Sequence, residues 1–382
     1  MKIAIVTSNN IRIGKDTKKG TEIVFKMLVE HLAQRQENSL SITAFCSGDS
    51  DLPVPIESVE PFHTSNDPTT PLEKNIIFEL ALLSKAFSRE KDFDLYNIHI
   101  GDGDIALPFA RFITTPVLIT IHHVFDKPYA KRYFALFKDL PHVGFISLSH
   151  YQRTLLPDLN YVGTIYNGIE VNTFSFDPTG GKDMMWSARG VPEKGLDTAF
   201  NVVRKTGRNT NFFIIKKPGY ENWLTQTLEM IPNLGIQDKT DIVFDQIREE
   251  LVATYQKSKL FLFPTLLEEV CPLSALEAMA CGTPVVAFAK GSVPELVADG
   301  VTGFIVNSSP DDIRGDWVIK KTGIEGLVEA VNKIYTMPED EYRIMRRACR
   351  DRIEKNFTSE KMAEHYLQIY QQAAENQGAN RK

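Results

Sequence analysis

The chain has 382 residues, more than twice the ~150 of a typical domain, and 43% of them are apolar, so we expect two domains with full hydrophobic cores. This composition excludes a disordered chain, a collagen-like fibre and a disulfide-stapled mini-protein. With 43 basic and 49 acidic side chains the net charge is −6, so no nucleic-acid partner is expected.

The cysteines and the apolar runs bear on where the protein works. The four cysteines, Cys46, Cys271, Cys281 and Cys349, show no CxxC spacing and are predicted to be reduced thiols, neither disulfides nor a zinc site. The apolar run at 2–7 is too short for a signal-peptide core, and the longest apolar runs fall far short of the ~20 residues that span a bilayer. We expect a cytoplasmic protein, peripheral at most to the inner face of the membrane.

Short apolar segments alternate with amphipathic helical patterns along the chain. Segments that are apolar on both faces and separated by helices are typical of parallel sheets covered on both sides. Two such series in succession predict an α/β protein with two doubly wound, Rossmann-like domains. The predicted strands are 2–8, 41–47, 95–100, 116–122 and 143–149 in the first half, and 183–188, 211–216, 240–245, 260–264, 284–289 and 303–306 in the second.

A turn signal at Asn167-Gly168 marks the expected domain boundary. It predicts an N-terminal domain at 1–166 and a C-terminal domain at 167–356, followed by a helical segment at 357–382 that opens with a threonine cap. Ligands of open parallel sheets bind beyond the carboxyl ends of the strands, so we expect the site in a cleft between the two domains.

In the first half, His99 and His122 end two predicted strands that should be neighbours. Their roles are either structural or catalytic. The spacing of Asp102-Gly103-Asp104 resembles a metal-binding DxD, but the same spacing recurs at 49–51 and 92–94, so we predict no metal site.

The segment 127–138 combines four basic residues with four aromatic ones and predicts a short helix. A solvated face over a core stripe is one interpretation, and contact with an anionic membrane is the other.

In the second half, a strand runs into a turn that carries Arg189 and Lys194 with two glycines. Two cations at the carboxyl end of a strand suit a diphosphate, because arginine can fork onto its oxygens and lysine acts as a point charge. Solvated surface cations are the alternative.

Glu277 lies on a helix that is apolar nearly all round, where a carboxylate is rarely buried without a partner. Two interpretations remain open. Glu277 either bonds to an internal arginine or backbone donor, or accepts hydrogen bonds from ligand hydroxyls. Glu269, eight positions earlier in the loop that enters this helix, is placed to reach the same ligand.

Together these segments resemble the retaining glycosyltransferases of family 4, which have the GT-B fold. The resemblance covers almost the whole chain and is strongest over the family's Glu–seven–Glu motif, from Glu269 to Glu277. Further similar segments are Ala278–Val286, Gly291–Val297, Asp299–Phe304, Asn167–Ile169, Glu193–Gly195 and Gly20–Glu22.

The resemblance implies transfer of a sugar from a UDP- or GDP-linked donor to a glycan, a lipid-linked or a small-molecule acceptor. It implies retention of configuration, no metal, no other cofactor, and a last helix that crosses back to the N-terminal domain. The implied catalytic residues are Arg189, Lys194, Glu269 and His122. Arg189 and Lys194 would hold the diphosphate, and Glu277 would hold the ribose. Glu269 and the backbone amides near Cys271 and Leu273 would contact the sugar, with His122 beside it. The loop before Gly20 would approach the acceptor or the phosphates.

Two departures from the family pattern stand out. Lys19 occupies a position where the family often has glycine, and Cys271-Pro272 replaces the commoner Phe-Gly, which removes one backbone donor near the sugar. The rival functions are a non-catalytic nucleotide- or glycan-binding accessory protein and a sugar-nucleotide epimerase on the same architecture.

Overall fold

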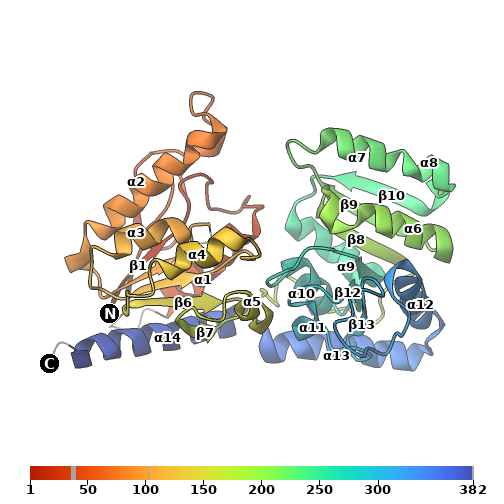
Figure 1. Cartoon of the computed structure of the whole chain (residues 1–382). Helices are drawn as coiled ribbons and strands as arrows, with labels where there is room; N and C mark the ends of the chain where they lie inside the picture. The colour runs from red at the N-terminus through yellow and green to blue at the C-terminus, as the bar shows by residue number, and fades with distance from the viewer. Residues whose placement is uncertain (36–39, 102, 381–382) are drawn as a thin grey trace. The chain divides into compact units, whose positions relative to one another are not determined.

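The computed structural model describes residues 1–35, 40–101 and 103–380. The chain divides into two compact units (Figure 1). The first unit comprises Met1–Gly168 and Ser359–Lys382, and the second unit comprises Ile169–Thr358.

The first unit is built on a parallel sheet. Among the described residues it has seven strands in the order β3-β2-β1-β4-β5-β6-β7. The central strands are buried on both faces, which explains why their sequences are continuously apolar instead of alternating. The strands are β1 (Lys2–Val6), β2 (Ser41–Phe45), β3 (Ile56–Glu57), β4 (Leu95–Ile98), β5 (Val117–Thr120), β6 (Val143–Ser147) and β7 (Tyr161–Thr164).

Helices accompany this sheet. In α1 (Gly20–Gln34) the apolar residues recur at helical spacing, and Ile23, Val24, Met27 and Leu28 are among its buried residues. The other helices of the unit are α2 (Asn75–Phe87), α3 (Leu107–Ala110), α4 (Pro128–Ala135), α5 (His150–Leu155) and α14 (Ser359–Asn380).

The last helix, α14, belongs to the first unit and packs against α1 and β4 (Figure 1). Its side chains Met362, Tyr366 and Tyr370 are buried there. The C-terminal segment therefore contributes core residues to a unit whose remaining residues are the first 168 of the chain.

The second unit repeats the architecture with six described strands in the order β10-β9-β8-β11-β12-β13, again parallel. The strands are β8 (Asp183–Arg189), β9 (Thr210–Ile215), β10 (Thr240–Phe244), β11 (Ser258–Phe263), β12 (Val285–Phe288) and β13 (Gly303–Val306). The helices are α6 (Leu196–Thr206), α7 (Glu221–Leu228), α8 (Met230–Leu234), α9 (Val252–Lys257), α10 (Leu273–Ala280), α11 (Val293–Leu296), α12 (Gly323–Thr336) and α13 (Glu339–Asn356).

The predicted fold class, two doubly wound parallel-sheet domains, is confirmed. Strands β3 and β7, the two outer strands of the first sheet, were not predicted from the sequence. Edge strands are only half covered and need no continuous apolar run, and β7 contains Gly163 and the exposed Val162. All four cysteines are free thiols, and all four are buried. Within the described residues, no helix combines the length and the apolar character needed to cross a bilayer.

Candidate functional site

The chain reverses its direction of winding between β8 and β11 of the second unit. These two strands are neighbours, with β9 and β10 on one side and β12 and β13 on the other. Crevices that bind ligands in doubly wound sheets open at this switch point, beyond the carboxyl ends of the strands. The segments that leave β8 and β11 there are 190–195 and 264–272. The predicted site residues of the second unit therefore lie on or beside these two loops.

Backbone contacts join these two loops. The amide of Leu266 donates to the carbonyl oxygen of Glu193 at 2.8 Å, and the hydroxyl of Thr265 donates to the same oxygen at 3.3 Å. Gly195 has a φ of +69°, and a Cβ there would lie 2.2 Å from the carbonyl oxygen of Pro264. Glycine is therefore required for this approach, which holds the turn after β8 against the loop after β11.

Lys194 and Glu269 form an ion pair across the two loops. Lys194 ends a 3₁₀ turn, Pro192–Lys194, and both side chains are largely buried, with 12% and 14% exposed. The same carboxylate oxygen accepts a hydrogen bond from the Thr265 hydroxyl at 3.2 Å. The pair places one cation and one anion together at the switch point.

Arg189 is the last residue of β8, and its side chain is exposed. The guanidinium forms no hydrogen bond or ion pair with any residue that the structure describes. Its five donors are thus available to an anionic ligand beyond the end of the strand.

The backbone of Glu269 is fixed by a third loop, after β12. The amide of Ser292 donates to the Glu269 carbonyl oxygen at 2.8 Å. Gly291 has a φ of +54°, and a Cβ there would lie 2.2 Å from that same oxygen. The neighbouring Glu268 is held by two hydrogen bonds from Arg314, at 2.6 and 2.8 Å. The loop that carries Glu269 is therefore anchored to the loop after β12 and to Arg314.

Glu277 lies on α10 with only 6% of its side chain exposed. It forms an ion pair with Arg248 and accepts a hydrogen bond from the hydroxyl of Tyr255 at 3.1 Å. Burial and the adjacent carboxylate raise the pKa of Tyr255 well above its ordinary value. This geometry corresponds to the internal-arginine interpretation of Glu277, and its role toward a ribose stays a prediction.

The remaining donor-side residues lie at the start of α10. Cys271 is buried, Pro272 precedes the helix, and Leu273 is its first residue. The amides of the first helical turn have no partner within the helix, so they are donors toward the loop that carries Glu269. Their contact with a sugar stays a prediction.

His122 and Gly20 belong to the first unit. Gly20 is the first residue of α1, and the Lys19 ammonium before it donates to Glu22 at 2.9 Å. His122 follows β5 and His99 follows β4, and their rings share a hydrogen bond of 2.9 Å. Both strands end slightly earlier than predicted. Burial lowers the pKa of both imidazoles, that of His99 to about 3.

Two other candidate segments of the first unit can be placed. Asp104 begins a short 3₁₀ turn and Asp102 lies outside the described residues, so the predicted absence of a DxD metal site stays a prediction. The basic segment 127–138 forms α4 and the turn after it, with Phe134 in the core and both Lys131 and Arg132 exposed.

Sequence reasoning missed several polar partners of the predicted residues. Glu277 is held by Arg248, in a 3₁₀ turn at Arg248–Leu251, and by Tyr255 on α9. The local sequence around these two residues does not predict this contact. Asn97 could have been predicted as a buried polar residue from the sequence, because it lies inside the otherwise apolar strand β4. It accepts a hydrogen bond from His99.

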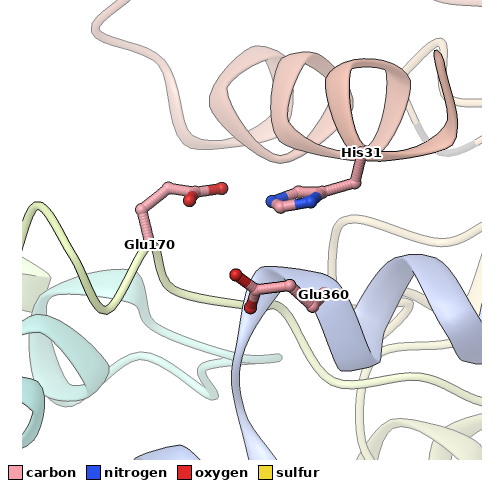
Figure 2. Close-up of side chains that lie close together, drawn as sticks. All are labelled: His31, Glu170 and Glu360. Carbon is pink, nitrogen blue, oxygen red and sulfur yellow. The ribbon is translucent and has the colours of Figure 1, made fainter. Parts of the chain in front are cut away.

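His31, Glu170 and Glu360 are drawn together in Figure 2. His31 on α1 and Glu360 on α14 belong to the first unit, whereas Glu170 belongs to the second. The ligand atoms that one unit contributes are too few for a metal site, so no metal centre is assigned to these residues.

The sequence of the second unit is similar to a known protein family. Residues 173–352, just under half of the chain, match the family described as "Glycosyl transferases group 1". Over 90 residues, 24% of this chain, the sequence is 44% identical to D-inositol 3-phosphate glycosyltransferase of Mycolicibacterium smegmatis, of which the match covers 20%. The chain spans about a fifth of the length of the curated relatives it matches.

Solved structures resemble almost the whole chain in fold. A sucrose-phosphate synthase from Thermosynechococcus elongatus aligns with a TM-score of 0.72 at 17% identity, over 97% of this chain and 98% of that one. Anabaena HepE in complex with UDP also gives 0.72, at 16% identity, over 99% and 100%. The chain thus has the two-domain GT-B fold, and the segment that carries Arg189, Lys194, Glu269 and Glu277 is similar to the group 1 glycosyl transferases.

Proposed function

We propose that this protein is a glycosyltransferase that moves a sugar from a nucleoside-diphosphate sugar to a hydroxyl acceptor. The observation that carries the proposal is the switch point of the second unit, where the Lys194–Glu269 pair joins the two loops and the exposed Arg189 ends β8. These residues belong to the segment that matches a glycosyl transferase family.

The charges at this point suit a diphosphate leaving group. Departure of the nucleotide builds negative charge on the phosphate oxygens, and cations fixed in advance stabilise that charge without reorganisation. Arg189 would fork onto two of those oxygens and Lys194 would supply a point charge. Because Glu269 is paired with Lys194, it would lie beside the bond that breaks and would accept a hydrogen bond from a sugar hydroxyl.

We further propose that configuration is retained, as the resemblance of the sequence implies, without a covalent intermediate on Glu269. A carboxylate that is paired with a buried lysine is a poor nucleophile, because the ion pair stabilises its charge. We infer that the acceptor hydroxyl attacks from the face that the nucleotide leaves, and that the departing phosphate takes its proton. Two fixed cations can perform the task that a divalent ion performs in other transferases, so activity should survive a chelator. Loss of activity that magnesium restores would contradict metal independence.

The donor is proposed to carry uridine, which is supported by the likeness in fold to HepE bound to UDP. Calorimetry with UDP and GDP, followed by a screen of nucleotide sugars for slow hydrolysis without acceptor, tests the proposal. Arg189→Ala should weaken UDP binding by roughly 1.5–3 kcal/mol, the range for a hydrogen bond to a charged group. Arg204→Ala, which removes an exposed arginine of α6, is the control. Equal UDP affinity in both variants would contradict the diphosphate role.

A further inference from the structure

A continuous chain of hydrogen bonds leads from α14 to His122 inside the first unit. The hydroxyl of Tyr370 donates to Asn97 Oδ1 at 2.6 Å, and the same oxygen lies 2.7 Å from His99 Nε2. His99 Nδ1 lies 2.9 Å from His122 Nε2. Tyr370, Asn97 and His99 have no exposed surface and His122 is 7% exposed, so these bonds are shielded from bulk water.

The orientation of the Asn97 amide sets the direction of this chain. Its Nδ2 donates to the carbonyl oxygen of Leu118 and to the hydroxyl of Thr120, both at 3.2 Å. A carbonyl oxygen can only accept, so the amide nitrogen must face Leu118 and the amide oxygen must face His99 and Tyr370. Asn97 Oδ1 then accepts two hydrogen bonds.

The protons of both imidazoles follow from this orientation. Because Asn97 Oδ1 is an acceptor, His99 Nε2 must carry a proton. His99 is neutral near pH 7, since burial lowers its pKa to about 3, so its Nδ1 carries none and must accept. The donor to it is His122 Nε2. His122 is neutral as well, which leaves its Nδ1 without a proton. That Nδ1 forms no hydrogen bond with any residue that the structure describes.

We propose that Asn97, His99 and Tyr370 are positioning residues that hold His122 in the Nε2–H tautomer, so that its Nδ1 is offered to a ligand as a hydrogen-bond acceptor. An acceptor nitrogen selects a group that can donate, such as a sugar hydroxyl, and rejects the diphosphate oxygens of a nucleotide sugar, which carry no proton near pH 7. Only this choice of ligand rests on the proposed function; the tautomer itself depends on the buried network alone.

Nitrogen NMR reads the tautomer directly and needs no substrate. Long-range ¹H–¹⁵N correlation spectra of the full chain, labelled with ¹⁵N-histidine at pH 7, should show a protonated Nε2 and an unprotonated Nδ1 for both rings. Spectra of His99→Gln and His122→Gln assign the signals, and exposed His365 on α14 is the reference for an unconstrained ring. A protonated Nδ1 on His122, or an imidazolium, would overturn the proposal.

Two tyrosine variants separate positioning from packing. Tyr370→Phe removes one of the two donors to Asn97 Oδ1, which loosens the amide, and should admit a fraction of the other His122 tautomer. Tyr366→Phe, one turn earlier on α14, removes an equally buried hydroxyl that bonds to Thr120 at 3.3 Å, and should leave the tautomer unchanged. Asn97→Leu should release His99 and with it His122. Unchanged tautomers in both Tyr370→Phe and Asn97→Leu would overturn the positioning role. A failure to find glycosyl transfer would leave the NMR result standing.

Discussion

Lys194 and Glu269 neutralise each other in the free chain, where each is more than four-fifths buried. A diphosphate that binds beside Lys194 would compete with Glu269 for the ammonium, and Glu269 would regain hydrogen-bonding capacity for a sugar hydroxyl. Binding would thus exchange the partners of both side chains, because the ammonium would pair with the diphosphate and the carboxylate would accept a hydrogen bond from the sugar.

The first prediction concerns this lysine. Lys194→Ala should lower turnover by roughly 10²–10³, because a fixed donor to the leaving group is lost. Stability should fall by about 1–3 kcal/mol, the cost of leaving the partly buried Glu269 without its donor. Steady-state kinetics and urea unfolding measure the two effects. The control is Lys205→Ala, which removes an exposed lysine paired with Glu325 in the same unit. Turnover of the Lys194 variant equal to that of the control would exclude Lys194 from catalysis.

Glu277 supports a second prediction, since its pairing with Arg248 can be separated from any contact with ribose. Glu277→Gln leaves the Arg248 charge largely buried without its counter-ion, so the free energy of unfolding should fall. Adding Arg248→Met should restore stability, because an apolar side chain replaces the unpaired charge. Affinity for UDP should stay reduced by roughly 1.5–3 kcal/mol in both variants if Glu277 also bonds the ribose. Calorimetric affinity that recovers together with stability would reduce Glu277 to a structural role.

Single residues can be predicted from the sequence where a polar side chain stands among apolar neighbours. Glu277 was found because a carboxylate stands on an apolar helix, and Asn97 could have been found in the same way on β4. Arg248 could not, because an arginine in a polar turn is ordinary, and only the tertiary fold brings it to Glu277 across 29 positions of sequence.

Among the elements, the central strands were predictable because burial on both faces demands continuous apolar sequence. The edge strands β3 and β7 carry no such demand and were missed. Helix α4 was predicted only in part. The aromatic residues of its segment divide, with Phe134 in the core while Tyr129 is more than half exposed, so the sequence alone did not say which of its faces is free.

The third prediction follows from that free face. Lys131 and Arg132 are exposed on α4 and form no ion pair with the described residues, so any membrane contact should be electrostatic. Lys131→Glu with Arg132→Glu should weaken sedimentation with phosphatidylserine vesicles by about 2 kcal/mol or more, at roughly 1 kcal/mol per basic residue. Lys320→Glu, an exposed lysine of the second unit, is the matched control. Equal binding to neutral phosphatidylcholine vesicles, or no loss in the double variant, would contradict a membrane role for α4.

In the whole molecule, the two units can be followed separately. All three tryptophans, Trp186, Trp223 and Trp317, belong to the second unit, so their fluorescence reports its unfolding. The buried histidines His99 and His122 belong to the first unit, whose core also includes Tyr366 and Tyr370 of α14. Amide exchange in β4 and β5 reports that unit.

The fourth prediction is that acid weakens the first unit before the second. His99 has a pKa of about 3 when folded and about 6.5 when unfolded, so between these values the unfolded chain binds a proton that the folded chain does not. Stability is therefore full above pH 6.5 and falls as the pH decreases, by about 2 kcal/mol at pH 5 from His99 alone. His122 acts in the same direction, because burial and then the nearby His99, His123 and Lys19 lower its pKa.

Hydrogen exchange of β4 and β5 peptides between pH 5 and pH 7, corrected for the intrinsic rate, measures this loss, and tryptophan fluorescence in urea provides the internal reference. His99→Gln removes one titrating group and should flatten the pH dependence by about 1.4 kcal/mol per pH unit below pH 6. His365→Gln replaces an exposed histidine of α14 and should retain the full slope. If stability depends on pH with the same slope in both variants, His99 must be charged in the folded chain. A charged His99 could not accept a hydrogen bond at Nδ1, so His122 would not be held with its own Nδ1 as an acceptor.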